Sequence, residues 1–355
     1  DKGEQGDAIF AKDGIDYTTS AEYVKFTLAD GTTIQVPKYI ANPNAVHVAT
    51  GGGLEQALEN AGLAPYTITE LTITGTLGTK DFQYMRDQLD ALNHLDISGT
   101  NLTGIGTYAF EGMPIETIVL PKGLKEIREG AFYGCKSLRS LDIPASVETL
   151  GQWIVWDCNQ LQTVTLHNGL KTLSANTFSN CGISSITIPS TVKEIPNQCF
   201  STCKNLERIY LHDDITSIGA SAFYECYSLK SFTAPKSLTV LSDNVFYTCK
   251  NLSLVLLHDD IESIGDNAFN GCELLRRLLT YEESTEYDVI RWPLSLTTIG
   301  AFAFQSSGLE EVYIKDSPVT TIPQEAFRDC KNLTKVTLSN ELKTIGNSAF
   351  YNTPI

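Results

Sequence analysis

The feature that most constrains this chain is a repeat of 22 or 23 residues. An aliphatic residue is followed five positions later by phenylalanine or valine, and this pair recurs eleven times between residues 105 and 355. One interval is longer, the 35 residues from Ile264 to Ile299. Such a period is typical of solenoids, whose units cannot bury their apolar side chains alone and must stack. The pairs are Ile105/Phe110, Ile127/Phe132, Leu150/Val155, Leu173/Phe178, Ile195/Phe200, Ile218/Phe223, Leu241/Phe246, Ile264/Phe269, Ile299/Phe304, Ile322/Phe327 and Ile345/Phe350.

Each unit predicts one short strand and one turn of helix. Residues 218–240 show the pattern, IGASAFYECYSLKSFTAPKSLTV. The L-x-x-L-x-I portion ends in strict alternation, which predicts a strand with every second residue turned inward. The proline that follows cannot donate to a ladder, so it ends the strand. The A-F-x-x-C portion has helical spacing and no proline, which predicts a helical turn on the opposite side.

This pattern resembles the leucine-rich-repeat class with a 23-residue unit, called BspA-like, of Treponema pallidum-type and Bacteroides surface proteins. The resemblance covers residues 67–355. It implies an α/β fold, a right-handed solenoid with a parallel sheet on its concave side and short helical turns on its convex side. The third unit departs from the pattern, because residues 151–158 (GQWIVWDC) carry Trp153, Val155 and Trp156 around the place of Ala-Phe. We expect the two indoles to fill the space that phenylalanine vacates.

The N-terminal third divides into two further regions. Residues 1–66 lack the period and predict a linker and a β-rich segment, with a hairpin over residues 23–36 around Asp30-Gly31 and a short helix over residues 54–62. Residues 67–104 predict the cap that an open solenoid end needs. There, residues 79–92 place Phe82, Met85, Leu89 and Leu92 on one helical face. The repeat array then runs over residues 105–355, with an insertion near residues 280–292.

Charge and hydropathy exclude two classes of partner. The net charge of −16 and the absence of a Lys/Arg-rich face argue against nucleic acid. No apolar stretch of about 18 residues exists, so no segment predicts a transmembrane helix. The chain opens on Asp1 without a signal-peptide pattern, and we expect any leader or anchor to lie outside this chain. Together with the resemblance, this predicts a protein that is secreted or anchored to the outer membrane at the cell surface.

Cysteine and histidine recur in phase but do not predict a metal site or a cofactor. Eight of the nine cysteines share one slot of the unit, and we expect them to be free, buried and packed as small hydrophobic residues. His167, His212 and His258 follow strands in every second unit, so they should lie about 10 Å apart, too far to share one metal. Whether the two His-Asp-Asp edges, residues 212–214 and 258–260, bind a cation stays open. No catalytic motif is present, which predicts that the chain is not an enzyme.

The residues that point outward from the strands predict a binding surface. They are small and polar in the first units, whereas later units gather tyrosine, arginine and leucine, the first two of which are enriched at binding hot spots. Insertions in repeat arrays often lie on the binding face, so the insertion extends this candidate site. Alternatively, the insertion covers the exposed leucines. The candidate ligand-binding residues are Arg208, Tyr210, Leu254, Leu256, Arg277, Leu279, Tyr313, Tyr287 and Trp292.

These observations favour a non-enzymatic adhesion protein. It would act as a monomer and present its solenoid surface to a protein or an extended glycan on a host or on neighbouring bacteria. Two alternatives remain open. One is a glycan-binding surface lipoprotein module, in which tyrosine and tryptophan stack on sugars, and the other is a passive spacer.

Overall fold

A computed structural model describes residues 16–19, 23–27, 33–37, 43–280 and 291–355. The chain divides into two compact units, residues 1–45 and residues 46–355. In the first unit β2 pairs antiparallel with β1 and with β3, with Phe26 opposite Ile34. The predicted hairpin is therefore confirmed, although its Asp30-Gly31 turn lies outside the described residues. The strands are β1 (Asp16–Thr19), β2 (Tyr23–Thr27) and β3 (Thr33–Pro37).

The second unit begins with a cap in which two helices cover the first strands. The predicted cap helix is confirmed over residues 79–88, and Phe82 and Met85 on its inner face are buried. It ends earlier than predicted, so Leu89 and Leu92 are buried beyond its last turn. The buried carboxylate of Asp81 accepts hydrogen bonds from the backbone N–H groups of Gly52, Leu54 and Gly78, so it joins the starts of both helices. The elements are β4 (Ala45–Val48), α2 (Leu54–Asn60), the 3-10 helix η1 (Pro65–Thr67), β5 (Glu70–Gly75), α3 (Thr79–Gln88) and β6 (His94–Thr100).

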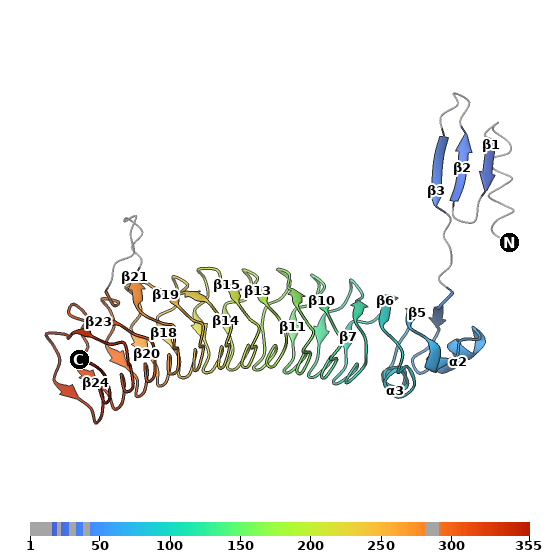
Figure 1. The fold of residues 1–355 in the computed structure, drawn as a ribbon. Helices are drawn as coiled ribbons and strands as arrows, with labels where there is room; N and C mark the ends of the chain where they lie inside the picture. Colours follow the sequence, from blue (N-terminus) through green and yellow to red (C-terminus); the bar gives the residue numbers. More distant parts are fainter. Residues whose placement is uncertain (1–15, 20–22, 28–32, 38–42, 281–290) are drawn as a thin grey trace. The chain divides into compact units, whose positions relative to one another are not determined.

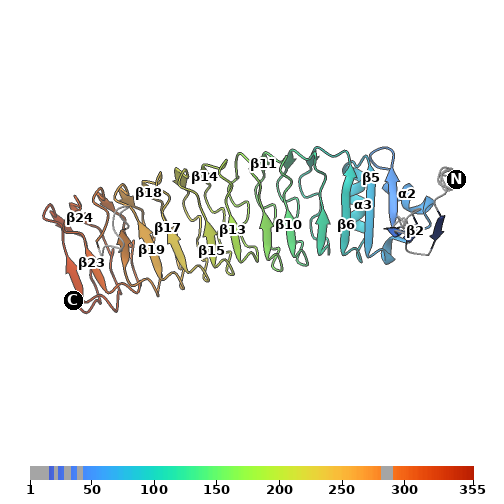
Figure 2. The same cartoon turned by 90° about the horizontal axis from the view of Figure 1, so that it is seen from above.

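After the cap, the chain winds into stacked turns with two rows of parallel strands (Figures 1 and 2). The first row was predicted from the L-x-x-L-x-I portion. Its strands are β8 (Thr117–Val119), β10 (Ser140–Asp142), β12 (Thr163–Thr165), β13 (Ser185–Thr187), β15 (Arg208–Tyr210), β17 (Ser231–Thr233), β19 (Leu254–Leu257), β21 (Leu278–Thr280), β23 (Glu311–Tyr313) and β25 (Lys335–Thr337).

A second row of two-residue strands was not predicted. In most units it is formed by the aliphatic residue that begins the unit together with the residue before it, and Ile195 stands opposite Ile218 in it. Its strands are β7 (Gly104–Ile105), β9 (Glu126–Ile127), β11 (Thr149–Leu150), β14 (Glu194–Ile195), β16 (Ser217–Ile218), β18 (Val240–Leu241), β20 (Ser263–Ile264), β22 (Thr298–Ile299), β24 (Thr321–Ile322) and β26 (Thr344–Ile345).

The A-F-x-x-C portions form tight turns, which differs from the helical turn expected from their spacing. In residues 218–226 the backbone of Ser221 and of Glu225 is left-handed, with φ of 56° and 54°. Every second N–H therefore points along the solenoid, and Ser221, Phe223 and Glu225 donate to the next unit at 2.9, 3.0 and 2.8 Å. A helix would keep these hydrogen bonds within its own unit. The left-handed residues thus exchange helical bonds for bonds between units.

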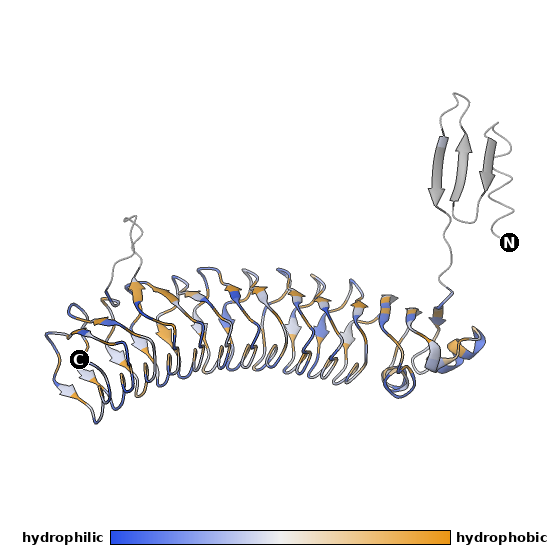
Figure 3. Cartoon of the chain, viewed as in Figure 1, coloured by the Kyte–Doolittle hydropathy of each residue, from blue (hydrophilic) through white to orange (hydrophobic). Residues whose placement is uncertain are grey.

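The core is a continuous column of apolar side chains inside the turns, and hydrophobic residues recur at the same place in successive turns (Figure 3). The phenylalanine rings stack face to face, for example Phe200 on Phe223 with centroids 5.6 Å apart and planes 3° apart. Phe223 in turn stacks on Phe246 at 5.5 Å. Each unit therefore buries its ring against its neighbours, as the period predicts.

The cysteines are free and buried, as expected. Most of the thiols in the shared slot donate to the carbonyl of the phenylalanine one unit earlier, as from Cys226 Sγ to Phe200 O at 3.1 Å. That carbonyl also accepts the N–H of Cys203 from its own unit, so the thiol occupies its second lone pair. Burial raises the pKa of the Cys135 thiol to about 12, which keeps it protonated as a donor.

Candidate binding surface

The strand face, meaning the outward side chains of the first-row strands β8 to β25, carries most of the predicted site. Tyr210 is 51% exposed and Leu254 is 38% exposed, although both side chains are large and apolar. Arg208 and Arg277 are also exposed, whereas Leu256, Leu279 and Tyr313 are half-buried.

The ladder register brings the three leucines together. Leu254 and Leu256 project from the same strand, β19, and Leu256 stands opposite Leu279 on β21. On the other side, β17 places the small residues Ser231 and Thr233 opposite the leucines of β19. The structure therefore forms one leucine patch with a polar border. Arg277 lies just before β21 and pairs with Glu310 at 3.8 Å.

The first-row sheet is interrupted between β15 and β17, which belong to separate sheets. A hollow of about 290 Å³ lies there, and Arg208, Tyr210, Ser231 and Thr233 contribute to its lining. The polar strand β17 lies between the Arg208/Tyr210 pair on β15 and the leucine patch on β19 and β21. The candidate site is therefore two adjacent parts of one face.

A second interruption lies between β8 and β10. The hollow there is about 520 Å³ and includes the exposed Val119, together with Asp142 and His167. His167 Nε2 lies 2.9 Å from Asp142 Oδ1, so these two side chains bind each other across neighbouring units. Sequence reasoning singled out neither interruption, because both units match the repeat.

The insertion departs from the prediction at Trp292. Its side chain is only 2% exposed and lies against Phe304 and Phe327, at 5.0 and 6.2 Å between ring centroids. Its assignment as an exposed ligand contact is therefore wrong, because the indole fills the core. A signal existed in the sequence, since W-P-x-x-L at residues 292–296 matches I-P-x-x-V at residues 143–147. Tyr287 lies outside the described residues.

The end of the insertion is fixed to a His-Asp-Asp edge. Arg291 donates to both carboxylate oxygens of Asp259, and the N–H of Leu294 donates to the same carboxylate at 3.1 Å. The Arg291 side chain is 12% exposed, so the pair is partly shielded from water. Hydrogen bonding from Arg291 lowers the pKa of the Asp259 carboxyl. Asp259 thus has a structural partner, and the insertion re-enters the array at a defined point.

The three edge histidines bind within the protein. His212 Nε2 lies 2.9 Å from the carbonyl oxygen of Val192, and His258 Nε2 lies 2.9 Å from that of Pro235. In the part of the chain that the structure describes, no three histidine, cysteine or acidic residues converge as a metal site would require. The strand face presents apolar, aromatic and cationic side chains.

The third unit also departs from the sequence expectation. Ile154 and Val155 are buried and occupy the Ala-Phe slots, so the core is already filled. Trp153 and Trp156 lie in the tight turns and are half-buried at the surface. The expectation that these indoles replace phenylalanine in the core is wrong, because valine occupies the phenylalanine place.

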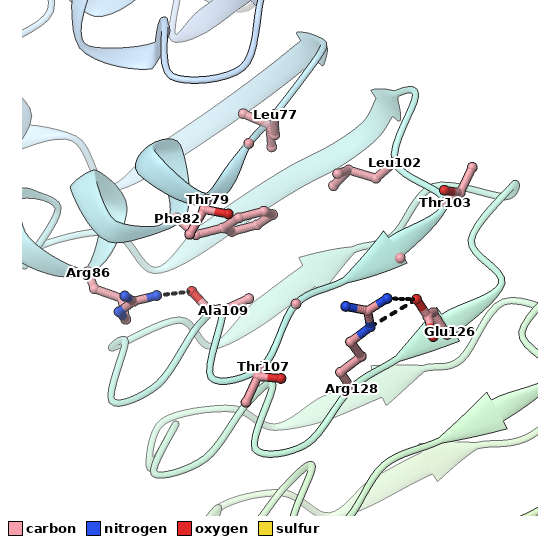
Figure 4. A pocket seen from close by; sticks show the side chains of 13 residues that line it. Leu77, Thr79, Phe82, Arg86, Leu102, Thr103, Thr107, Ala109, Glu126 and Arg128 are labelled. Atoms are coloured by element: carbon pink, nitrogen blue, oxygen red, sulfur yellow. Dashed lines mark hydrogen bonds and ion pairs between the residues drawn. The ribbon is translucent and has the colours of Figure 1, made fainter.

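A further hollow of about 530 Å³ lies where helix α3 meets the first repeat turn (Figure 4). Its walls combine Phe82, Leu102 and the ion pair of Arg128 with Glu126. Arg86 crosses the junction and donates to the carbonyl oxygens of Tyr108 and Ala109 at 3.0 and 2.9 Å. These bonds fasten the cap helix to the array.

Comparison with known proteins matches this architecture. The model of the BspA type leucine rich repeat region matches in six copies, over residues 82–207, 193–289 and 279–355. A leucine-rich repeat protein from Bacteroides ovatus is similar at 21% identity and a TM-score of 0.58, with 96% of this chain and 91% of that chain covered. This likeness shows the fold alone. No curated protein matches the chain.

Two other solved structures are similar at lower TM-scores. A leucine rich cell surface protein from Faecalibacterium prausnitzii shares 19% identity, with 92% of this chain and 95% of that chain covered at a TM-score of 0.41. The T. pallidum leucine rich repeat protein shares 18% identity, with 73% and 91% covered at a TM-score of 0.35. Among the described residues, no helix is both long enough and apolar enough to cross a membrane.

Proposed function

The chain belongs to the BspA-type leucine-rich repeat family, and we propose that it is a non-enzymatic adhesion protein of the bacterial cell surface. It binds a macromolecule of a host or of neighbouring bacteria through the strand face. The leucine-rich-repeat solenoid is typical of binding proteins, and the matched model describes a repeat and not a catalytic domain.

One observation carries this proposal. The strand face exposes Tyr210 and Leu254 within two units of each other, with Arg208 beside them. Tyrosine and arginine are enriched among residues that dominate binding energy, and a contiguous apolar patch on a soluble protein often marks an interaction site. Strands β10, β12 and β13 of the same face present Asp142, Thr165 and Thr187 at the matching position, so they offer a polar surface for comparison.

The test is binding to a panel of host matrix proteins and to a glycan array. A triple variant, Tyr210→Ala with Arg277→Ala and Tyr313→Ala, should lose capture of the ligand while its circular dichroism spectrum is retained. The matched control is Asp142→Ala with Thr165→Ala and Thr187→Ala, which changes three outward residues of the polar half and should bind normally. Full binding by the first variant would remove the strand face as the site.

The same panel separates the alternative functions. Binding to matrix proteins alone supports the proposal, whereas binding to glycans alone favours a carbohydrate-binding module. Binding to neither favours a spacer. Protease treatment of intact cells tests the location independently, because the protease cleaves proteins at the surface but cannot reach proteins in the cytoplasm.

A further inference from the structure

A second candidate site lies on the turn ribbon, meaning the tight turns that follow the second-row strands β7, β9 and β11. There, a hollow of about 440 Å³ is lined by Tyr108, Glu111, Tyr133, Trp153 and Trp156. Its volume is that of a small-molecule site. The hollow is formed by turns and not by the first-row strands, so it is separate from the strand face.

The rings come from three successive units and have a defined arrangement. Tyr108 meets Tyr133 edge to face, with centroids 5.8 Å apart and planes at 68°. Tyr133 is parallel to Trp156, with centroids 6.5 Å apart and planes at 7°. All four aromatic residues are half-buried, so each keeps part of its surface open to a ligand.

Two backbone features make room for this arrangement. Gly130 occupies the first left-handed slot, where other units carry a side chain, and a Cβ there would lie 2.2 Å from Cε1 of Tyr108. The absent side chain allows the Tyr108 ring to lie over the backbone. In the next unit the same slot holds Trp153 at φ 54°, a conformation uncommon for a bulky residue.

The hollow is electrically negative. Glu111 lines it, and Glu129 accepts a hydrogen bond from the Tyr108 hydroxyl at 3.2 Å. Among the described residues, neither carboxylate forms an ion pair with lysine or arginine. Burial and both carboxylates raise the pKa of Tyr108, so its hydroxyl stays protonated. Asp157, next to Trp156, is instead neutralised by Lys136 at 3.3 Å.

We propose that this hollow binds an alkylated ammonium group, as found in choline or trimethyl-lysine. Such a cation is weakly hydrated, and the faces of tryptophan and tyrosine attract it through their quadrupoles. Glu111 and Glu129 add a Coulombic attraction that a neutral ligand does not feel. A neutral sugar could stack on the same rings, but it would gain nothing from the negative charge of Glu111 and Glu129.

The first experiment is titration of the whole chain with choline chloride, followed by tryptophan fluorescence. The chain has three tryptophans, and two of them line the hollow while Trp292 is buried in the core. Choline should change the emission saturably at constant ionic strength. The neutral isostere 3,3-dimethylbutan-1-ol should bind at least about tenfold more weakly, because it lacks the charge. Equal binding of both compounds, or no saturable signal with choline, would overturn the proposal.

Variants test whether the aromatic hollow binds choline without disturbing the fold. Gly130→Asn should displace the Tyr108 ring while preserving the backbone, because Asn244 adopts φ 55° in the same slot. It should weaken choline binding about tenfold at an unchanged melting temperature. Glu111→Gln should weaken choline but not the neutral isostere. The matched control is Tyr247→Ala, which removes a ring that stacks on Tyr224 at 5.0 Å in the turns of later units, and it should leave binding unchanged.

Two further ligands distinguish the sources of the ammonium group. Phosphocholine vesicles present it as a lipid headgroup, and a trimethyl-lysine peptide presents it on protein. Tighter binding of either ligand than of choline supports the proposed site and identifies whether the ammonium group comes from a lipid or from a protein. If maltose changes the emission saturably while choline does not, the hollow is a sugar-stacking site and the ammonium proposal is overturned.

Discussion

Residues 218–240, called the regular unit below, and residues 150–172, the third unit, share the same backbone conformation in their turns but carry different side chains there. Both place left-handed residues at the same two slots, Ser221 and Glu225 in one and Trp153 and Asp157 in the other. Both donate from these residues to the following unit, at 2.9 and 2.8 Å in the first and at 3.3 and 3.0 Å in the second. The backbone is therefore set by stacking, and the two units differ in their side chains.

The side chains divide between core and surface in different ways. The regular unit buries the ring of Phe223 and carries Ser221 and Tyr224 half-buried at the two turn positions that hold tryptophan in the third unit. The third unit buries Ile154 and Val155 and sends two indoles outward. The comparison teaches that a repeat protein can change its surface locally without changing its fold, provided that the core slots stay apolar. Departures from the repeat are thus where function is to be sought.

The largest expected effect comes from removing the core ring of the regular unit. Phe223→Ala should lower the free energy of unfolding by about 3–5 kcal/mol, because it leaves a cavity between two stacked rings. The matched change in the third unit, Val155→Ala, should cost only about 1–2 kcal/mol because fewer methylene groups are lost. Urea denaturation followed by circular dichroism measures both. Equal costs would mean that the third unit is as tightly packed as the regular one.

The next effect concerns the glycine after the aliphatic residue. In the regular unit, a Cβ on Gly219 would lie 2.4 Å from the backbone nitrogen of Asn197 in the preceding unit. Gly106 fills the same slot in the first unit, where a Cβ would meet nothing within 4 Å. Gly219→Ala should therefore cost about 1–3 kcal/mol through overpacking, whereas Gly106→Ala should be close to neutral. If Gly106→Ala is also destabilised, glycine is needed at this position for the conformation of its own turn and not for contact with the preceding unit.

The features that could be predicted from the sequence are those that repeat from unit to unit. Residues of the same type as Phe223, Cys226 and the inward strand residues recur in most units and are mostly buried, because stacking gives each unit similar surroundings. The tight turns were taken for helix because A-F-x-x-C satisfies both geometries. A better signal was the recurrence of Asn, Asp and Gly at the two left-handed slots, as at Asn176 and Asn180, since these residues tolerate positive φ.

The site was less predictable because it depends on exceptions. The alternation of the strands placed Tyr210 and Leu254 on the strand face correctly. Trp292 was misassigned because the insertion obscured its match to the inward residue before proline. The aromatic hollow was missed because it needs Gly130 and Trp153 to be compared across units, and each alone reads as an irregularity. Whether either surface binds a ligand stays a prediction that the binding tests decide.

The unit that carries the insertion allows the comparison between units to include the pH dependence of stability. Asp259 binds Arg291, whereas its counterpart two units earlier, Asp213, lies 3.8 Å from Lys236 at an exposed edge. The pKa of Asp259 is lowered below its usual 3.8, so the pair stabilises the fold above that pH and is lost as the pH falls through the lowered value. Asp259→Asn should cost about 1 kcal/mol at neutral pH, allowing for solvent screening of a side chain that is 34% exposed.

Asp213→Asn is the control for this pair and should be close to neutral. Urea denaturation at pH 7 and at pH 3 should show that the difference between Asp259→Asn and the wild type shrinks at the lower pH. An undiminished difference would mean that the Arg291 ion pair does not account for the stabilisation.

The smallest expected effect distinguishes the two units most sharply. Trp153→Asn replaces a bulky residue at φ 54° by one that the same slot carries at Asn176 and Asn244. Relief of the left-handed strain, about 1 kcal/mol, opposes the loss of half-buried indole surface, so the free energy of unfolding should change by less than about 1 kcal/mol. Ser221→Trp in the regular unit introduces the same strain between units that carry Gln198 and Asn244 in that slot, and it should be destabilising by calorimetry. If Trp153→Asn instead unfolds the array, the indole is a structural element of the third unit, and its exposure has no separate purpose.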